Sequence, residues 1–299
     1  MINEISGLSK SFTFISTMIN GFTWVDWLAF ASCWPALALY TALSDRHGVE
    51  AECLLGASRR ARMGWAVSAA KRPLSGRMVD ASILGTLNNS AVFFASSALL
   101  GLGAFLSLTV SPERIKDAID AMGVVGFASR DTHLIVAKAA VAGGFFGWSF
   151  LKFTWSMRQI AFAASLCGSF GEHGADPEDE ARKIESFADL SSLAGESFNL
   201  GLRSFYWSMA ACCWLLSPWL CIACSGALAY GLWRREFRSE TLRALQKAHP
   251  PLPAAAPAVP GMSFPLFWTR SKPSGIAERQ AHAPNVASLQ ALEEAARDN

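Results

Sequence analysis

Four polar side chains near the ends of two apolar segments are the clearest candidates for chemistry in this sequence. Lys152, Arg158 and Gln159 close one segment, and Arg203 opens the next. Ammonium and guanidinium groups pair well with phosphate, so these residues predict a site for an anionic lipid head group or another anionic ligand. In the structural alternative, which we favour, they anchor two helices to the head-group layer and bond one another.

Cysteines form a second group of reactive side chains. The pair Cys221 and Cys224 has the spacing of a redox or metal site, and Cys212 and Cys213 belong to the same apolar segment. Because that segment contains no histidine, we interpret the four thiols as small residues that pack between helices. A redox or lipid-modifying enzyme that uses these thiols or the basic cluster is our third hypothesis.

Established catalytic signatures are absent from the sequence. It contains no Walker loop, no zinc-protease motif and no nucleophile elbow. A haem or metal site in a helical bundle normally needs paired histidines on facing helices, whereas the five histidines here fall in predicted loops or the tail. We therefore predict no catalytic residue, no cofactor and no metal, and we lean towards a protein that is not an enzyme.

The composition indicates an integral membrane protein. Hydrophobic residues make up 52% of the chain and charged residues 17%, and the segments 81–112 and 205–233 carry no charge at all. About 20 apolar residues suffice to cross a hydrocarbon core about 30 Å thick. The net charge of +2 is too small to indicate a nucleic-acid partner.

We predict an all-α, polytopic fold in which four membrane-spanning helices form a bundle. Asp26 is expected to stay at the interface, and prolines predict kinks at Pro35 and Pro218. A basic helix near 50–70 is predicted to lie on the bilayer surface or in a solvated loop. Asp176 and Pro177 predict the start of an amphipathic helix that leads into the fourth span. The predicted parts are an N-terminal segment 1–21, a membrane domain 22–239 with spans 24–43, 81–110, 134–155 and 205–233, and a Pro/Ala-rich, largely disordered tail 240–299 with one short helix near 286–296.

Small and polar residues inside the spans predict contacts between helices. Two faces of small residues, spaced four apart, favour close helix packing. Lys138 is expected to extend to the membrane interface, and two asparagines are candidate polar groups inside the membrane. The packing candidates are Ser97, Gly101, Gly143 and Gly147, and the polar candidates are Asn88, Asn89 and Lys138.

Four stretches of sequence resemble the uncharacterised membrane family catalogued as domain of unknown function 599. They are residues 93–97, 152–159, 201–206 and 234–239, and their order and spacing fit the family across about 26–239. The resemblance implies a four-helix membrane domain without an established activity. The chain has Val136 where the family tends to have a glutamate, so the family's Glu–Lys pair with Lys138 is not implied here. The polar positions that coincide with the family pattern are Arg77, Asp80, Lys138, Lys152, Arg158, Gln159 and Arg203.

These observations favour a non-enzymatic membrane component that binds a protein partner or lipid. The alternative is a small transporter or channel that forms by homo-oligomerisation, with the asparagines and small-residue faces along its pathway. The expected location is the plasma membrane, which is the inner membrane in a bacterium. Basic residues are nearly balanced between the two sides of the four-span arrangement, and the first basic loop places 44–80 and 156–204 in the cytoplasm.

Overall fold

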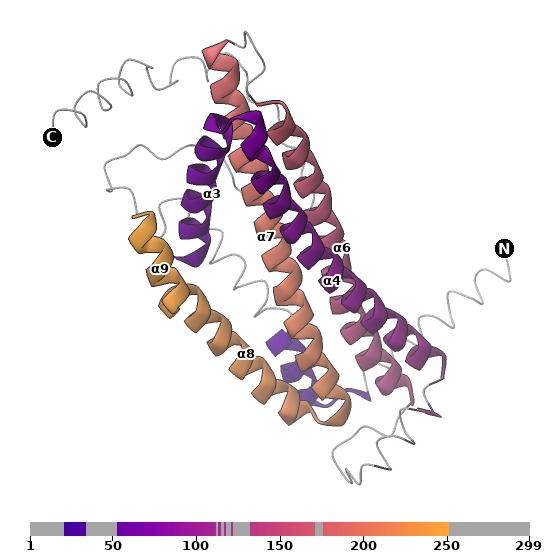
Figure 1. Ribbon diagram of the computed structural model, residues 1–299. Helices are drawn as coiled ribbons and strands as arrows, with labels where there is room; N and C mark the ends of the chain where they lie inside the picture. Colours follow the sequence, from indigo (N-terminus) through magenta and orange to yellow (C-terminus); the bar gives the residue numbers. More distant parts are fainter. Residues whose placement is uncertain are drawn as a thin grey trace, which may run out of the picture. The chain divides into compact units, whose positions relative to one another are not determined.

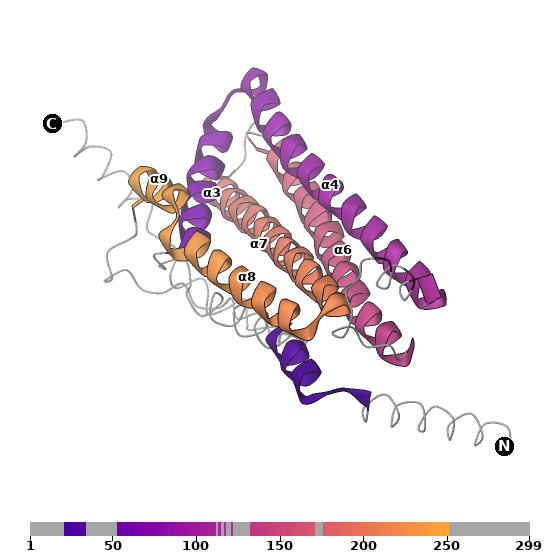
Figure 2. The same cartoon turned by 90° about the horizontal axis from the view of Figure 1, so that it is seen from below.

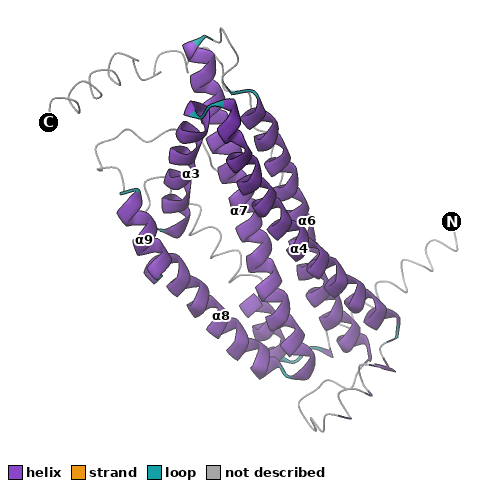
Figure 3. Cartoon of the chain, viewed as in Figure 1, coloured by secondary structure: helices purple, strands orange, loops and turns teal. Residues whose placement is uncertain are grey.

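Every regular element in the described part of the chain is helical, so the predicted all-α class is confirmed. The computed structural model describes residues 21–33, 53–111, 113–114, 117, 121, 132–170 and 176–250. Residues 24–33 are helical, although the rest of the first predicted span lies outside the described residues. The other helices are α3 (Leu54–Lys71), the short η1 (Leu74–Gly76), α4 (Arg77–Val110), α6 (Thr132–Gly168), α7 (Pro177–Leu216), α8 (Pro218–Arg238) and α9 (Glu240–Ala248) (Figure 1, Figure 3).

Two of these helices, α4 and α6, are long and apolar enough to cross a membrane. They contain 34 and 37 residues, which is about 51 and 56 Å at 1.5 Å per residue, so each exceeds the thickness of a bilayer core. The spans predicted at 81–110 and 134–155 fall inside them, but α6 continues to Gly168. It does so because Ile160, Ala163 and Cys167 recur at helical spacing and remain buried beyond the apolar stretch.

The fourth predicted span is two helices rather than one. Ser217 is extended and Pro218 begins α8, so the chain breaks at the predicted position. The Nη2 atom of Arg203 lies 3.6 Å from Oε2 of Glu236, although these residues would be roughly 50 Å apart in one straight helix. α7 and α8 therefore form an antiparallel hairpin (Figure 1, Figure 2).

The basic helix predicted near 50–70 is α3, but it packs against α7. The ring of its Trp65 is 5.0 Å from that of Phe187 in α7, and its small residues Gly56, Ala57, Ala66 and Ala69 are buried. The contact is close because the side of α3 that faces α7 is lined mainly by small residues. One side of α3 is therefore covered by α7, while Met63 and Val67 are exposed.

The segment assigned to the disordered tail begins with an ordered helix, α9. The hydroxyl of Ser239 accepts a hydrogen bond from the amide of Leu242 at 3.1 Å, which caps its first turn. α9 packs against α3, where Nε of Arg60 donates to the carbonyl of His249 at 3.2 Å. The tail prediction is therefore wrong for 240–248. Residues 251–299, like 1–20 and the predicted kink at Pro35, lie outside the described residues.

A ladder of serine hydroxyls joins α6 to α7. Ser149 donates to the carbonyl of Gly201 at 2.8 Å, Ser156 to that of Ala194 at 2.7 Å, and Ser204 to that of Phe145 at 2.9 Å. All three serines are almost fully buried. Each hydroxyl therefore has a partner in the neighbouring helix, and the two helix backbones approach closely along the seam.

Gly201 is the narrowest point of this seam, and its replacement by alanine is expected to destabilise the protein by about 1–3 kcal/mol. A methyl group there would lie 2.7 Å from the buried ring of Phe153. Gly144→Ala is the matched control, because a methyl group at Gly144 would meet nothing within 4 Å. That change is expected to stabilise α6 by up to about 1 kcal/mol. Unfolding in detergent–SDS mixtures, followed by circular dichroism, measures both; equal effects would contradict the close contact.

Candidate functional site

A buried ion pair joins the first helix to α6 and α7. The ammonium of Lys138 lies 2.7 Å from Oδ1 of Asp26, and the indole nitrogen of Trp214 donates to the same oxygen at 2.9 Å. The hydroxyl of Thr23 donates to Oδ2 at 2.7 Å. Lys138 is 2% exposed and Asp26 is 4% exposed. Every polar atom of the aspartate therefore has a partner, as a charge removed from water requires.

This arrangement gives both residues specific partners. The ammonium of Lys138 is buried beside Asp26, and both oxygens of the Asp26 carboxylate have partners. The ring of Trp214 also covers the ammonium, whose nitrogen is 5.4 Å from the ring centroid. The carboxylate of Asp26 thus connects three helices, and its charge and that of Lys138 hold these helices together.

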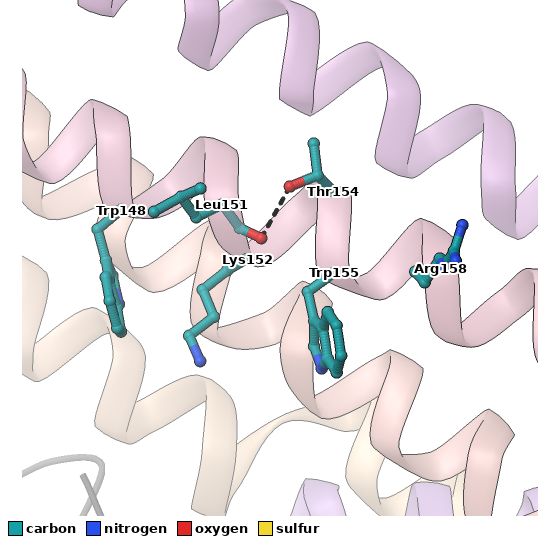
Figure 4. A pocket seen from close by; sticks show the side chains of 6 residues that line it. All are labelled: Trp148, Leu151, Lys152, Thr154, Trp155 and Arg158. Atoms are coloured by element: carbon teal, nitrogen blue, oxygen red, sulfur yellow. Dashed lines mark hydrogen bonds between the residues drawn. The ribbon is translucent and has the colours of Figure 1, made fainter. Parts of the chain in front are cut away.

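The four residues predicted to form one anionic site divide into two environments. Lys152 and Arg158 line a shallow groove of about 510 Å³ formed by residues of α6. Figure 4 shows Trp148, Lys152 and Trp155 projecting towards the same side of the helix. The nitrogen of Lys152 lies 4.9 Å from the centroid of the Trp148 ring. These two cations are the accessible half of the predicted cluster.

Gln159 and Arg203 belong to buried contacts instead. The side chain of Gln159 shares a hydrogen bond of 2.8 Å with the hydroxyl of Ser197 in α7. Arg203 pairs with Glu236 of α8, and Glu236 also accepts a hydrogen bond of 3.1 Å from the amide of Leu55. Because that amide belongs to the first turn of α3, the glutamate caps one helix while it joins two others. The structure therefore brings Lys152 and Arg158 to one groove and places Gln159 and Arg203 in separate buried contacts.

Charged residues also hold α3 in place on α7. Nε of Arg59 donates to Glu196 at 2.7 Å. One guanidinium nitrogen of Arg62 donates to the carbonyls of Ser191 and Ser192, at 2.7 and 3.1 Å. Burial lowers the pKa of Arg62, while the nearby carboxylate of Glu196 opposes that change. The guanidinium stays charged at neutral pH and fixes the two helices in register.

A second fully buried carboxylate lies where α3 turns into α4. Asp80 accepts a hydrogen bond from the indole of Trp65 at 2.7 Å and pairs with Arg72. Arg77 lines a separate groove of about 410 Å³ between α4 and α6, together with Asn88. Asn89 is exposed on α4. The two asparagines therefore face different surroundings.

Three of the four predicted small residues lie between α4 and α6. A methyl group on Gly101 would lie 2.6 Å from the ring of Phe146. Gly143 faces Phe105, and Gly147 faces Leu102. Ser97 is different, because its hydroxyl donates to the carbonyl of Phe93 within its own helix. The glycine at position 101 thus permits the close approach of α4 and α6.

The thiols are distributed over separate helices. Cys212 and Cys213 belong to α7, whereas Cys221 and Cys224 belong to α8. Cys221 faces Cys33 of the first helix, with 3.5 Å between the two sulfurs. In the described ranges, no three His, Cys, Asp or Glu side chains form a group that could hold a metal ion.

The serines that join α6 to α7, and Glu236, were not identified from the sequence. Ser149 and Ser156 are seven residues apart, and so are Ser197 and Ser204. Residues seven apart lie on one face of a helix, so the spacing of these serines could have indicated the seam between α6 and α7. Glu236 and Asp26 carried no comparable signal, because their partners are distant in the sequence.

Comparisons with known proteins identify a family but no characterised relative. The family model described as "protein of unknown function, DUF599" matches residues 28–241. No curated protein and no solved structure matches the chain. The match covers the first helix through the start of α9, and it bears out the resemblance seen in the sequence.

Proposed function

The chain belongs to the DUF599 family of unknown function. From that premise we propose that it is an integral membrane component that binds a protein partner or lipid and is not an enzyme. One observation carries this proposal. The buried carboxylates of the described residues all pair with basic residues of their own chain: Asp26 with Lys138, Asp80 with Arg72, and Glu236 with Arg203. The charges join helices to one another, as a scaffold requires, and do not converge on a space for a substrate.

Exposed aromatic residues support the position of the bilayer. Trp24 and Trp219 are in contact where the first helix and α8 begin, and Trp155 and Trp233 are exposed further along α6 and α8. α8 rises about 21 Å from Trp219 to Trp233, and α6 rises about 35 Å from its first residue to Trp155. The thickness of a hydrocarbon core, about 30 Å, lies between these two lengths. Tryptophan favours both membrane interfaces. Only 17% of the most apolar window of α4 is buried within the protein, so the bilayer covers the rest.

The helical hairpin changes the number of crossings in our proposal. With α4 and α6 across the bilayer, α7 and α8 each cross as well, because Trp214 contacts Lys138 near the start of α6 while Glu236 returns to α3. Together with the first span, which is predicted from the sequence at 24–43, this gives five crossings instead of the four expected from the sequence. α3 and α9 then lie on one side, outside the bilayer.

The charges around α3 support an orientation with this side in the cytoplasm. Arg114 is the basic residue at the opposite end among the described residues. The positive-inside rule therefore gives a clear preference, which the four-span arrangement did not. The basic residues on the α3 side are Arg59, Arg60, Arg62, Lys71, Arg72, Arg77, Arg182, Lys183, Arg234, Arg235, Arg238, Arg243 and Lys247.

Purification of the intact protein in mild detergent tests the assignment as a component. We expect a partner protein to co-purify in fixed stoichiometry, or lipid to remain bound in a defined number, when the mass of the complex is determined. The matched sample is the same protein after exchange into a harsh detergent, which should release the bound species. A defined homo-oligomer that retains neither partner nor lipid would contradict this proposal and favour the channel instead.

A further inference from the structure

Two cations that line the groove on α6 differ from the other basic residues at the proposed membrane level. Lys152 and Arg158 lie on either side of Trp155 along the groove, and Lys152 lies between Trp148 and Trp155 (Figure 4). The guanidinium of Arg158 is 5.4 Å from the ring of Phe162. No carboxylate of the described residues forms an ion pair with either cation. Lys138 and Arg203, by contrast, each have an acidic partner.

An unpaired ammonium at this level requires an anion from outside the chain. Lys152 is half-buried, and the free energy of a charged lysine rises steeply towards the bilayer centre unless it reaches an interface or a counter-ion. Trp148 and Trp155 lie on the same face of the helix, and indole rings favour the head-group level. The groove therefore combines positive charge with side chains that favour the boundary between lipid head groups and acyl chains.

We propose that this groove binds the phosphodiester of an anionic phospholipid in the leaflet on the α3 side. The ammonium of Lys152 pairs with the phosphate, and Arg158 adds a second positive charge on the other side of Trp155. Leu151 and the two indole rings lie along the first part of the acyl chains. This inference rests on the proposed function, because it requires the chain to lie in a bilayer with this orientation.

The lining of the groove favours a lipid over a free phosphate ion. Leu151, Trp148 and Trp155 are among the exposed large apolar side chains of the protein. A small ion would leave that surface uncovered, whereas a phospholipid covers it and neutralises the cations at the same time. The leaflet on the cytoplasmic side is also the one in which a basic surface meets anionic lipid.

Lipid retention in nanodiscs tests the proposal. The full chain is placed in nanodiscs of mixed phosphatidylglycerol and phosphatidylcholine, released, and the retained lipids are counted by native mass spectrometry. We expect wild type to retain phosphatidylglycerol preferentially. Lys152→Gln should weaken that retention about fivefold, the effect of about 1 kcal/mol for one basic residue near an anionic surface. Lys152→Arg should preserve it.

Arg182→Gln is the matched control, because it removes one positive charge from the same side of the protein at an exposed position. It should leave retention unchanged. Equal retention by Lys152→Gln and wild type, or equal retention of the two lipids by wild type, would overturn the proposal. Millimolar inorganic phosphate should fail to displace the lipid, and complete displacement would identify a small-anion site in place of a lipid site.

Extraction with alkaline carbonate separates this inference from the proposed function. Release of wild type from membranes by carbonate would contradict an integral membrane protein, and the lipid site would fail with it. If wild type stays in the membrane but shows no preference for phosphatidylglycerol, only the lipid site is overturned. The two failures are therefore distinguishable in the same preparation.

Discussion

The variant Asp26→Asn is expected to lower the free energy of unfolding by about 3–5 kcal/mol, the cost of leaving one member of a buried ion pair without its partner. Asparagine retains an oxygen that accepts from Trp214, so the main loss is the negative charge beside Lys138. That ammonium lies 2.7 Å from the carboxylate and is 2% exposed. Unfolding in detergent–SDS mixtures, followed by circular dichroism, measures the change.

A second substitution should rescue this variant. Lys138→Met removes the ammonium and fills most of its volume, so the double variant Asp26→Asn with Lys138→Met has no uncompensated charge. Replacement of a buried pair by apolar groups is often neutral, and we expect stability within about 1 kcal/mol of wild type for the pair. Asp179→Asn controls for the loss of an exposed ion pair, whose contribution is about 0–1 kcal/mol. If the double variant is no more stable than Asp26→Asn, the coupling between the two residues is refuted.

Helix identity was well predicted from the sequence wherever local signals decide it. The uncharged segment 81–112 became most of α4, and the uncharged segment 205–233 became the end of α7 and most of α8. Asp176 caps α7 by accepting from the amide of Glu178 at 3.4 Å. The break at Pro218 was predicted because proline lacks an amide hydrogen and restricts the preceding residue. These features depend on residues within one or two turns of each other, so a single sequence contains the information.

The partners of the polar side chains could not be predicted in the same way. Lys138 and Asp26 are far apart in the sequence, as are Arg203 and Glu236, and no periodicity relates them. The local position of Lys138 near a helix end favoured snorkelling, but tertiary packing placed a carboxylate beside it. The candidate anionic site divided for the same reason. Lys152 and Gln159 are seven residues apart on the same side of α6, and only the packing of α7 decides that Gln159 is covered while Lys152 lines a groove.

The direction of the chain after Pro218 could not be read from hydropathy. One continuous span and a hairpin have the same composition, and the apolar stretch 205–233 is long enough for a single crossing. The contact between Arg203 and Glu236 distinguishes them in the structure. In the proposed arrangement its consequence is large, because five crossings instead of four would move the segment after α8 to the other side of the membrane.

Reporter fusions are expected to place the C-terminus on the same side as α3. Green fluorescent protein fused after Asn299 should fluoresce, because the basic side is proposed to be cytoplasmic, and alkaline phosphatase at the same position should be inactive. A fusion after Lys71, at the end of α3, is the cytoplasmic reference, and a fusion after Ser111, beyond α4, is the reference for the opposite side. A four-span chain would give the reverse result at Asn299 with both references unchanged. Phosphatase that is active at both Asn299 and Ser111 would therefore reject the five-crossing arrangement. That result would require α7 and α8 to cross the membrane as one helix. Such a helix would separate Glu236 from Arg203 and from the first turn of α3.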